Sequence, residues 1–99
     1  MSADEIEEKL KTALPQLGNL SAVVKFDLGD DGQWLVDSRL SAPSLSSEDG
    51  DADCTILISA DNLAKLLDGD LDPMLAYTLG KIKIQGSMGV AMKLVSAIG

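Results

Sequence analysis

The fold is decided by the stretch Gly80-Lys81-Ile82-Lys83-Ile84-Gln85-Gly86-Ser87-Met88-Gly89. Polar and isoleucine side chains alternate over 81–85, which predicts a strand with Ile82 and Ile84 facing inward. Gly86 interrupts this alternation, and the apolar residues after it predict a final helix over about 87–97. The C-terminal part of the chain is therefore a strand that leads through a glycine into a helix.

The N-terminal half contains a predicted helix and a predicted hairpin. Apolar residues recur at helical spacing over 6–17, although Pro15 is expected to end or bend this helix. Segments 20–28 and 33–40 alternate apolar with polar side chains, and 29–32 reads Gly-Asp-Asp-Gly, a strong turn signal. This pattern predicts an antiparallel pair of strands with one face in water.

The middle of the chain adds a loop, a strand and two short helices. Residues 41–52 are mostly polar and form a predicted loop, with a short edge strand near Leu45, and 53–58 reads as a strand with Cys54 inward. Two short helices follow, the first capped by Ser59 or Asp61 and ended by Gly69, the second opened by Asp72-Pro73 and ended by Gly80.

These elements predict a single α+β domain over residues 1–99. A chain of 99 residues has room for one core, and a hydrophobic content of 45% is typical of a globular protein. Because one face of the sheet is polar, the apolar stripes of the helices must cover the other face. The expected architecture is therefore a two-layer sandwich of helices on a sheet.

The charge of the chain is strongly negative and unevenly distributed. The formal net charge is -8, and twelve acidic against two basic residues give -10 over 27–72. Residues 73–99 hold Lys81, Lys83 and Lys93 and no acid, giving +3. This charge disfavours nucleic acid and anionic membranes as primary partners, because each binds a cationic face. The lysines either form a solvated surface or orient a polar headgroup or a partner.

Catalytic chemistry finds little support in the sequence. The chain has no histidine, the commonest general base and metal ligand, and its one cysteine, Cys54, lies mid-strand on the inward face. Asp49, Asp51 and Asp53 lie in a polar loop that lacks the spacing of a calcium-binding loop. We therefore predict no catalytic residues, no metal site and no cofactor, and hence no enzyme.

The final helix is unusual because apolar residues cover nearly its whole circumference. One sheet can bury only one side of a helix, so the other side needs the short helices, a second subunit or an apolar ligand. Met74, Met88 and Met92 are either ordinary core residues or the adaptable lining of a pocket.

Several segments in the second half of the chain, in their residues and in their order and spacing, resemble one known family, the sterol carrier protein 2 domain. The resembling residues are those of 51–56, 63–67, 69–74 and above all Gly80 to Leu94, with support from Trp34-Leu35-Val36-Asp37. The resemblance implies a five-stranded, mostly antiparallel sheet, covered on one face by about four helices that enclose an apolar tunnel. It also implies non-catalytic binding and intracellular transfer of fatty acids, acyl-CoA esters, phospholipids or sterol-like lipids.

The predicted tunnel lining consists of inward apolar residues from strands and helices. Met92 is expected to face the tunnel and Lys93 the solvent, and glycines 69, 80 and 86 could act as hinges when the tunnel opens. The candidate ligand-binding residues are Phe26, Trp34, Val36, Ile56, Leu66, Met74, Ile82, Ile84, Met88, Met92 and Val95.

Location and partners are inferred from what the chain lacks. The acidic N-terminus is no signal peptide, no apolar run approaches the ~20 residues of a membrane span, and the last residues are no peroxisomal signal. These features predict a cytoplasmic location. Since the family resemblance comes without an attached thiolase or dehydrogenase domain, we expect a stand-alone, bacterial-type member of the family. No stable membrane insertion is expected, while transient membrane contact or a homodimer stays open. The alternative function is an interaction or dimerisation module that uses the final helix and has no lipid ligand.

Overall fold

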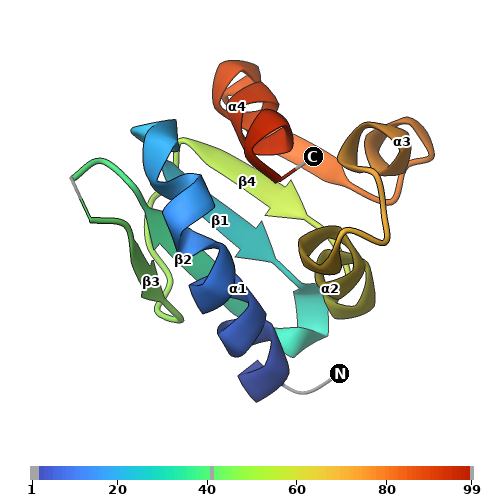
Figure 1. The fold of residues 1–99 in the computed structure, drawn as a ribbon, viewed down its shortest axis with the longest axis horizontal. Coiled ribbons are helices and arrows are strands. Elements are labelled where there is room, and N and C mark those ends of the chain that lie inside the picture. Colours follow the sequence, from blue (N-terminus) through green and yellow to red (C-terminus); the bar gives the residue numbers. More distant parts are fainter. Residues whose placement is uncertain (1–2, 41, 99) are drawn as a thin grey trace.

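A computed structural model describes residues 3–40 and 42–98, and its central element is a five-stranded mixed sheet (Figure 1). The strand order is β3-β2-β1-β4-β5. Strands β1 and β4 pair in parallel, whereas the other neighbours are antiparallel. This confirms the mostly antiparallel sheet expected from the sequence. The strands are β1 (Val23–Asp27), β2 (Gln33–Asp37), β3 (Ser44–Ser46), β4 (Cys54–Leu57) and β5 (Lys83–Gly86).

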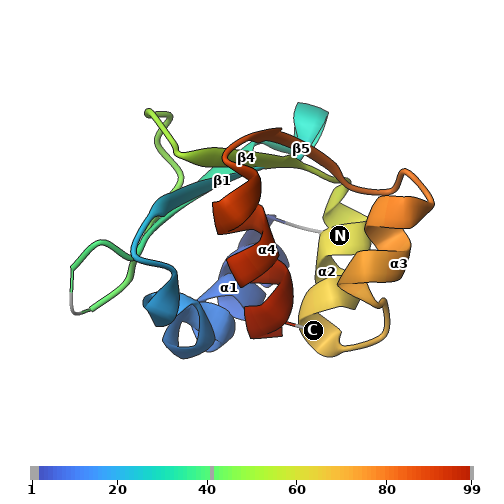
Figure 2. The same ribbon diagram turned by 90° about the horizontal axis from the view of Figure 1, so that it is seen from above.

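The helices lie together on one face of the sheet, which confirms the two-layer α+β architecture (Figure 2). In the described ranges there are four α-helices and two short 3-10 turns. Figure 2 shows α4 between α1 on one side and α2 and α3 on the other. The helical segments are α1 (Ala3–Leu17), η1 (Gly18–Leu20), η2 (Gly29–Asp31), α2 (Ala60–Asp68), α3 (Pro73–Thr78) and α4 (Met88–Ile98).

Helix α1 continues through Pro15 and ends at Leu17, directly before Gly18, so of the two effects expected of Pro15, an end or a bend, the structure excludes the end. Proline removes one backbone donor and its ring crowds the preceding turn, which normally interrupts a helix. Here Pro15 lies in the last turn with its side chain exposed, while Leu10 and Leu17 are fully buried. Burial of these leucines on both sides of the proline holds the last turn in place.

The two short helices begin and end where their capping residues predict. Ser59 is the cap of α2, because its side-chain oxygen accepts a hydrogen bond of 3.1 Å from the Asn62 N–H. Gly69 ends α2 with a φ of +83°. Asp72 caps α3 by accepting a hydrogen bond of 2.8 Å from the Met74 N–H.

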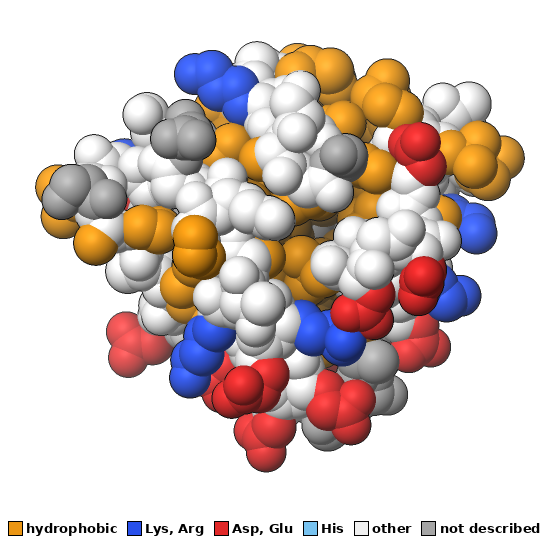
Figure 3. Space-filling view, in the orientation of Figure 1, with side chains coloured by type: hydrophobic (Ala, Val, Ile, Leu, Met, Phe, Trp, Pro, Cys, Tyr) orange, Lys and Arg blue, Asp and Glu red, His pale blue; other side chains and the backbone are white. Residues whose placement is uncertain are grey.

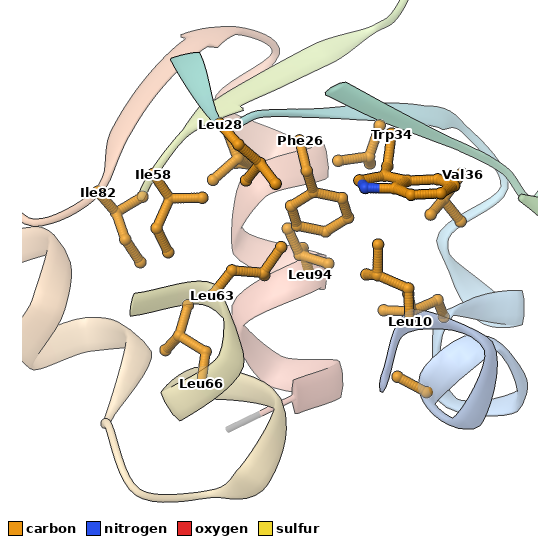
Figure 4. Close-up of a cluster of buried hydrophobic side chains, with 14 of the residues drawn as sticks. Leu10, Phe26, Leu28, Trp34, Val36, Ile58, Leu63, Leu66, Ile82 and Leu94 are labelled. Carbon is orange, nitrogen blue, oxygen red and sulfur yellow. The ribbon is translucent and has the colours of Figure 1, made fainter. Parts of the chain in front are cut away.

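Buried aliphatic and aromatic side chains fill the space between the two layers (Figure 4). Phe26 points from β1 toward Leu94 of α4. From α1, Leu10 points toward Trp34 and Val36 of β2. Each of these five side chains is at most 8% exposed, so the core runs from α1 across to α4.

Candidate functional site

The position of helix α4 is fixed by a close backbone approach at its start. Gly86 has a φ of +93°, and a Cβ atom there would lie 2.6 Å from the carbonyl oxygen of Asp53. The same oxygen accepts a hydrogen bond of 2.8 Å from the Ser87 N–H. The carboxylate of Asp53 accepts a further bond of 2.9 Å from the Val23 N–H. Asp53 thus connects the start of α4 to the start of β1.

Helix α4 is buried on one side only. Ala91 and Leu94 are fully enclosed against the sheet, whereas Met88 and Met92 are 46% and 39% exposed. The sequence predicted that something must cover the second side of this apolar helix. Within the described residues, that second side is left open to ligands or partners.

An open groove runs along α4 on the side of α1. Its volume is about 680 Å³, within the ~300–1,000 Å³ typical of small-molecule sites. We call it the α1–α4 groove, and it is lined by Gln16, Leu20, Met92, Lys93, Ser96 and Ala97. Its surface is mostly apolar, and its polar groups are the amide of Gln16, the hydroxyl of Ser96 and the ammonium group of Lys93.

Lys93 is the charged group of the α1–α4 groove. Its side chain is exposed, and no ion pair joins it to a carboxylate among residues 3–40 and 42–98. Lysine contributes a cation with three hydrogen-bond donors, which suits a carboxylate or a phosphate. The groove therefore combines an apolar surface with one cationic anchor.

A second open groove, of about 570 Å³, lies where the end of α4 meets the segment that leads into α3. It is lined by Gly69, Asp70, Leu71, Asp72, Pro73, Leu75 and Ile98. In the space-filling view, hydrophobic side chains are visible in a hollow at the centre of the helical face (Figure 3). The described part of α4 is thus bordered by hollows on two sides.

The structure separates the predicted lining residues into a buried set and an exposed set. Phe26, Trp34, Val36, Ile56, Leu66 and Ile82 belong to the continuous core. Ile84 and Val95 are half-buried, and Met74, Met88 and Met92 are exposed. Of the eleven, Met92 alone lines either groove.

Met92 and Lys93 both line the α1–α4 groove. The sequence places Met92 toward the tunnel and Lys93 toward solvent, and in the structure the side chain of Lys93 is exposed. Met92 is also 39% exposed, so a carboxylate at this position would keep contact with water. The large penalty of a buried charge therefore does not apply to Met92→Glu.

Sequence reasoning missed the groove residues that α1 and η1 contribute. Gln16 and Leu20 line the groove next to Ala97, far away in the sequence. A helical pattern identifies which residues face the sheet, but it does not say which helices will be neighbours. One feature of the sequence indicated a site at α4, namely the apolar residues beyond its sheet-facing side. Nothing in that pattern indicated that α1 and η1 would form the opposite wall.

The thiol of Cys54 behaves as a core group. Its side chain is 1% exposed, and burial raises the pKa of the thiol above its usual value of 9.0, with a smaller contribution from the charge of Asp53. A raised pKa leaves the thiol protonated and unreactive. The described residues contain no cluster of three potential metal ligands, and none of their helices has the length and apolar character to cross a membrane.

Comparison with known proteins identifies relatives of this fold. A family model for the SCP-2 sterol transfer family matches residues 3–99. Sterol carrier protein 2 of Oryctolagus cuniculus is 37% identical in an alignment of 97 positions that covers 91% of this chain and 18% of that protein. The chain therefore spans just under a fifth of the length of this curated relative.

Solved structures agree with the family match. The sterol carrier protein domain 2 of Helicoverpa armigera aligns with a TM-score of 0.73 and 26% identity, covering 96% of this chain and 80% of that one. Sterol carrier protein 2 from Aedes aegypti, solved in complex with palmitate, has the same fold, with a TM-score of 0.66, 18% identity and coverage of 92% and 94%. With its sheet order, its four helices and this match over nearly all of its residues, the chain belongs to the SCP-2 sterol transfer family.

Proposed function

We propose that this chain binds single acyl lipids, fatty acids first, and carries them between membranes without covalent chemistry. The observation that carries the proposal is the α1–α4 groove, which joins an apolar surface to the cation of Lys93. Family membership supports it, as does the palmitate complex of the Aedes aegypti relative. The absence of histidine and the protonated core thiol support a carrier over an enzyme.

The driving force for capture is removal of the acyl chain from water. Each buried methylene contributes ~0.8 kcal/mol, so about ten of them give a gross gain of ~8 kcal/mol, which sets a micromolar dissociation constant as the upper limit of affinity for that number. Ordering the flexible chain opposes this gain and keeps binding reversible. A carrier requires such moderate affinity, since it must also release its lipid.

We assign Lys93 as the contact of the fatty-acid carboxylate. The methylenes nearest the carboxylate would then contact Met92 and Leu20. Met92 has an unbranched, adaptable side chain and is 39% exposed, so it offers the acyl chain apolar surface directly, whereas Leu20 is 2% exposed and forms the floor of the groove. The ammonium group of Lys93 at the groove edge stays in water, where an ion pair contributes modestly.

The buried candidates enter the proposal through movement of α4. Phe26 contacts the layer of α4 through Leu94, so a lipid that displaces α4 from the sheet would reach Phe26 and then Trp34. Gly86, the last residue of β5, and Gly80, between α3 and β5, are the hinge points of this movement. The remaining candidates would line the acyl chain only in that open state.

The test is a titration of the purified chain with a fluorescent fatty acid, followed by displacement with palmitate. We expect saturable, displaceable binding with a micromolar dissociation constant and a change in the emission of Trp34. Failure of every acyl ligand to bind and be displaced would refute the proposal. A bound lipid that leaves Trp34 unchanged would refute the movement of α4 and leave the carrier function standing.

Two variants separate the roles within the groove. Lys93→Gln should weaken an ionised fatty acid by about 2–5-fold, the value of an exposed ion pair, while leaving the matching fatty alcohol unaffected. Met92→Glu should weaken both ligands, because it puts charge on the apolar part of the groove. The control is Leu40→Glu, the same kind of replacement at a leucine that is 77% exposed outside both grooves.

A cytoplasmic location belongs to this proposal. The single cysteine supports it, because Cys54 is buried and free, as suits a reducing compartment. Fractionation of the native cells with an antibody to this chain would test the assignment, and recovery with an extracytoplasmic fraction would contradict it.

A further inference from the structure

The α1–α4 groove offers a lipid headgroup a single positive charge. All eight basic residues of the chain lie in the described ranges, and Lys93 is the one that lines this groove. Four of the others are held in ion pairs away from the groove, namely Lys9, Lys11, Lys25 and Arg39. The remaining three line neither groove: Lys65, Lys81 and Lys83.

The polar side chains of the groove match one carboxylate. Ser96 follows Lys93 by three residues, which places both on the same side of α4, and Gln16 faces them from α1. Within residues 3–40 and 42–98, no hydrogen bond or ion pair occupies these three side chains. Their ammonium, hydroxyl and amide groups supply donors for the two oxygens of a carboxylate. The groove therefore has donors and charge for one small anion.

The walls around Lys93 are unfavourable for any further negative charge. Helix α1 carries four acidic residues against two lysines. Ser96 and Ala97 lie in the last turn of α4, which contains no basic residue. The carbonyl oxygens of that turn form the negative end of the helix. One charge of a headgroup is thus neutralised by Lys93, and each additional charge is repelled.

The groove on the other side of α4 is no better site for a polyanion. Its described lining includes the carboxylates of Asp70 and Asp72 and no basic residue. Acidic side chains also gather along the lower edge of the helical face in Figure 3. A headgroup with several phosphate charges therefore meets carboxylates without a matching set of cations on both sides of α4.

We propose that the α1–α4 groove selects acyl lipids by the charge of the headgroup, and takes free fatty acids in preference to their coenzyme A esters. The ester has lost the free carboxylate, and its phosphates carry about four negative charges. Because the groove is open, a large headgroup fits, and charge is the property that discriminates. The inference rests on the proposed carrier function, and it narrows the range of lipids that the family resemblance implies.

The test is displacement of a bound fluorescent fatty acid from the purified full chain by laurate, lauroyl-CoA and dodecanol, three ligands with the same chain length. At an ionic strength of about 0.01 M the Debye length is about 30 Å, so repulsion acts across the whole groove. We expect lauroyl-CoA to bind about tenfold more weakly than laurate, since about three charges stay unneutralised and each exposed charge pair changes binding by about two- to threefold. The difference should shrink at physiological salt, where the Debye length is about 8 Å. Dodecanol should show no dependence on salt.

Two matched variants separate the charge of the groove from the charge of the whole chain. Gln16→Lys adds a cation to the groove and should tighten lauroyl-CoA about threefold, more than it tightens laurate. Leu40→Lys adds the same charge at a side chain that is 77% exposed outside both grooves, and it should leave the preference unchanged. Equal tightening of lauroyl-CoA in both variants would overturn selection by the groove and assign the preference to the net charge of -8.

The three ligands also separate this inference from the carrier function on which it rests. Displacement by laurate, with lauroyl-CoA binding equally or more tightly, would overturn the selection and leave the carrier function standing. Displacement by lauroyl-CoA alone would refute both the selection and the assignment of fatty acids as first ligands. Displacement by none of the three would refute the carrier function together with the selection.

Discussion

Replacement of Gly86 by alanine should loosen the attachment of α4 to the sheet. The φ of +93° is unfavourable for alanine, and the new Cβ would lie 2.6 Å from the carbonyl oxygen of Asp53, where ordinary contacts begin at 3.4 Å. The turn must therefore open by about 0.8 Å, which is the difference between these two distances. That shift also stretches the 2.8 Å hydrogen bond from the Ser87 N–H to the same oxygen.

The expected loss of stability has two parts. A left-handed φ disfavours alanine by about 1–2 kcal/mol, and the close contact with the weakened hydrogen bond adds about 1–2 kcal/mol. Gly86→Ala should thus lower the free energy of unfolding by about 2–4 kcal/mol, a large share of the ~5–15 kcal/mol of a typical domain. Urea unfolding followed by the emission of Trp34, the single tryptophan, measures this change.

Gly80→Ala is the matched control. Gly80 also has a positive φ, +78°, but no atom lies within 4 Å of its hypothetical Cβ. It should lose only the conformational part, about 1–2 kcal/mol. Equal losses of stability in the two variants would show that the approach of Gly86 to Asp53 has no energetic consequence. A folded Gly86→Ala protein should also bind fatty acid more weakly and an apolar dye more strongly.

Three further changes test other parts of the structure. Cys54→Ser should lower the free energy of unfolding by about 1–3 kcal/mol, because a hydroxyl replaces a buried thiol. The affinity for fatty acid should stay unchanged. Loss of fatty-acid binding in a fully stable variant would contradict the assignment of Cys54 to the core. Leu94→Ala should lower stability by about 2–5 kcal/mol by opening a cavity under α4, whereas the exposed Met88→Ala should change it little in the same urea experiment. Hydrogen bonds from Arg39 hold the pKa of Asp37 at about 2 instead of 3.8, so this pair contributes its stability above pH 3.8 and loses it as the pH falls through 2. Arg39→Ala should return the pKa of Asp37 toward 3.8 in an NMR titration, and an unmoved pKa would show that another group sets it.

The helix boundaries follow from local chemistry, which explains why the sequence predicts them well. The capping side chains of Ser59 and Asp72, and the glycines after the helices, act within a few residues of the structure they specify. The strand expected over 81–85 lies instead at Lys83–Gly86 and includes the glycine expected to interrupt it. Pro15 does not end α1, because its local effect is overridden by burial of Leu10 and Leu17 in the tertiary structure.

The candidate site was harder to predict, because it depends on contacts between distant segments. Alternation reveals which face of a strand is buried, but it does not distinguish a side chain that fills the core from one that lines a hollow. Phe26 and Met92 share the pattern of apolar, inward residues, yet Phe26 is 1% exposed and Met92 borders a groove. The parallel pairing of β1 with β4 likewise depends on the whole chain, since neither strand carries a signal for its partner.

Binding of a fatty acid along α4 can be observed residue by residue in an NMR titration of the isotope-labelled chain with palmitate. We expect saturable shifts that centre on the amides of Gln16, Leu20, Met92, Lys93, Ser96 and Ala97, with weaker shifts at Phe26 and Trp34 as α4 moves. Palmitate that binds with shifts confined to β3 and α2, or that causes no saturable shift at all, would contradict binding along α4.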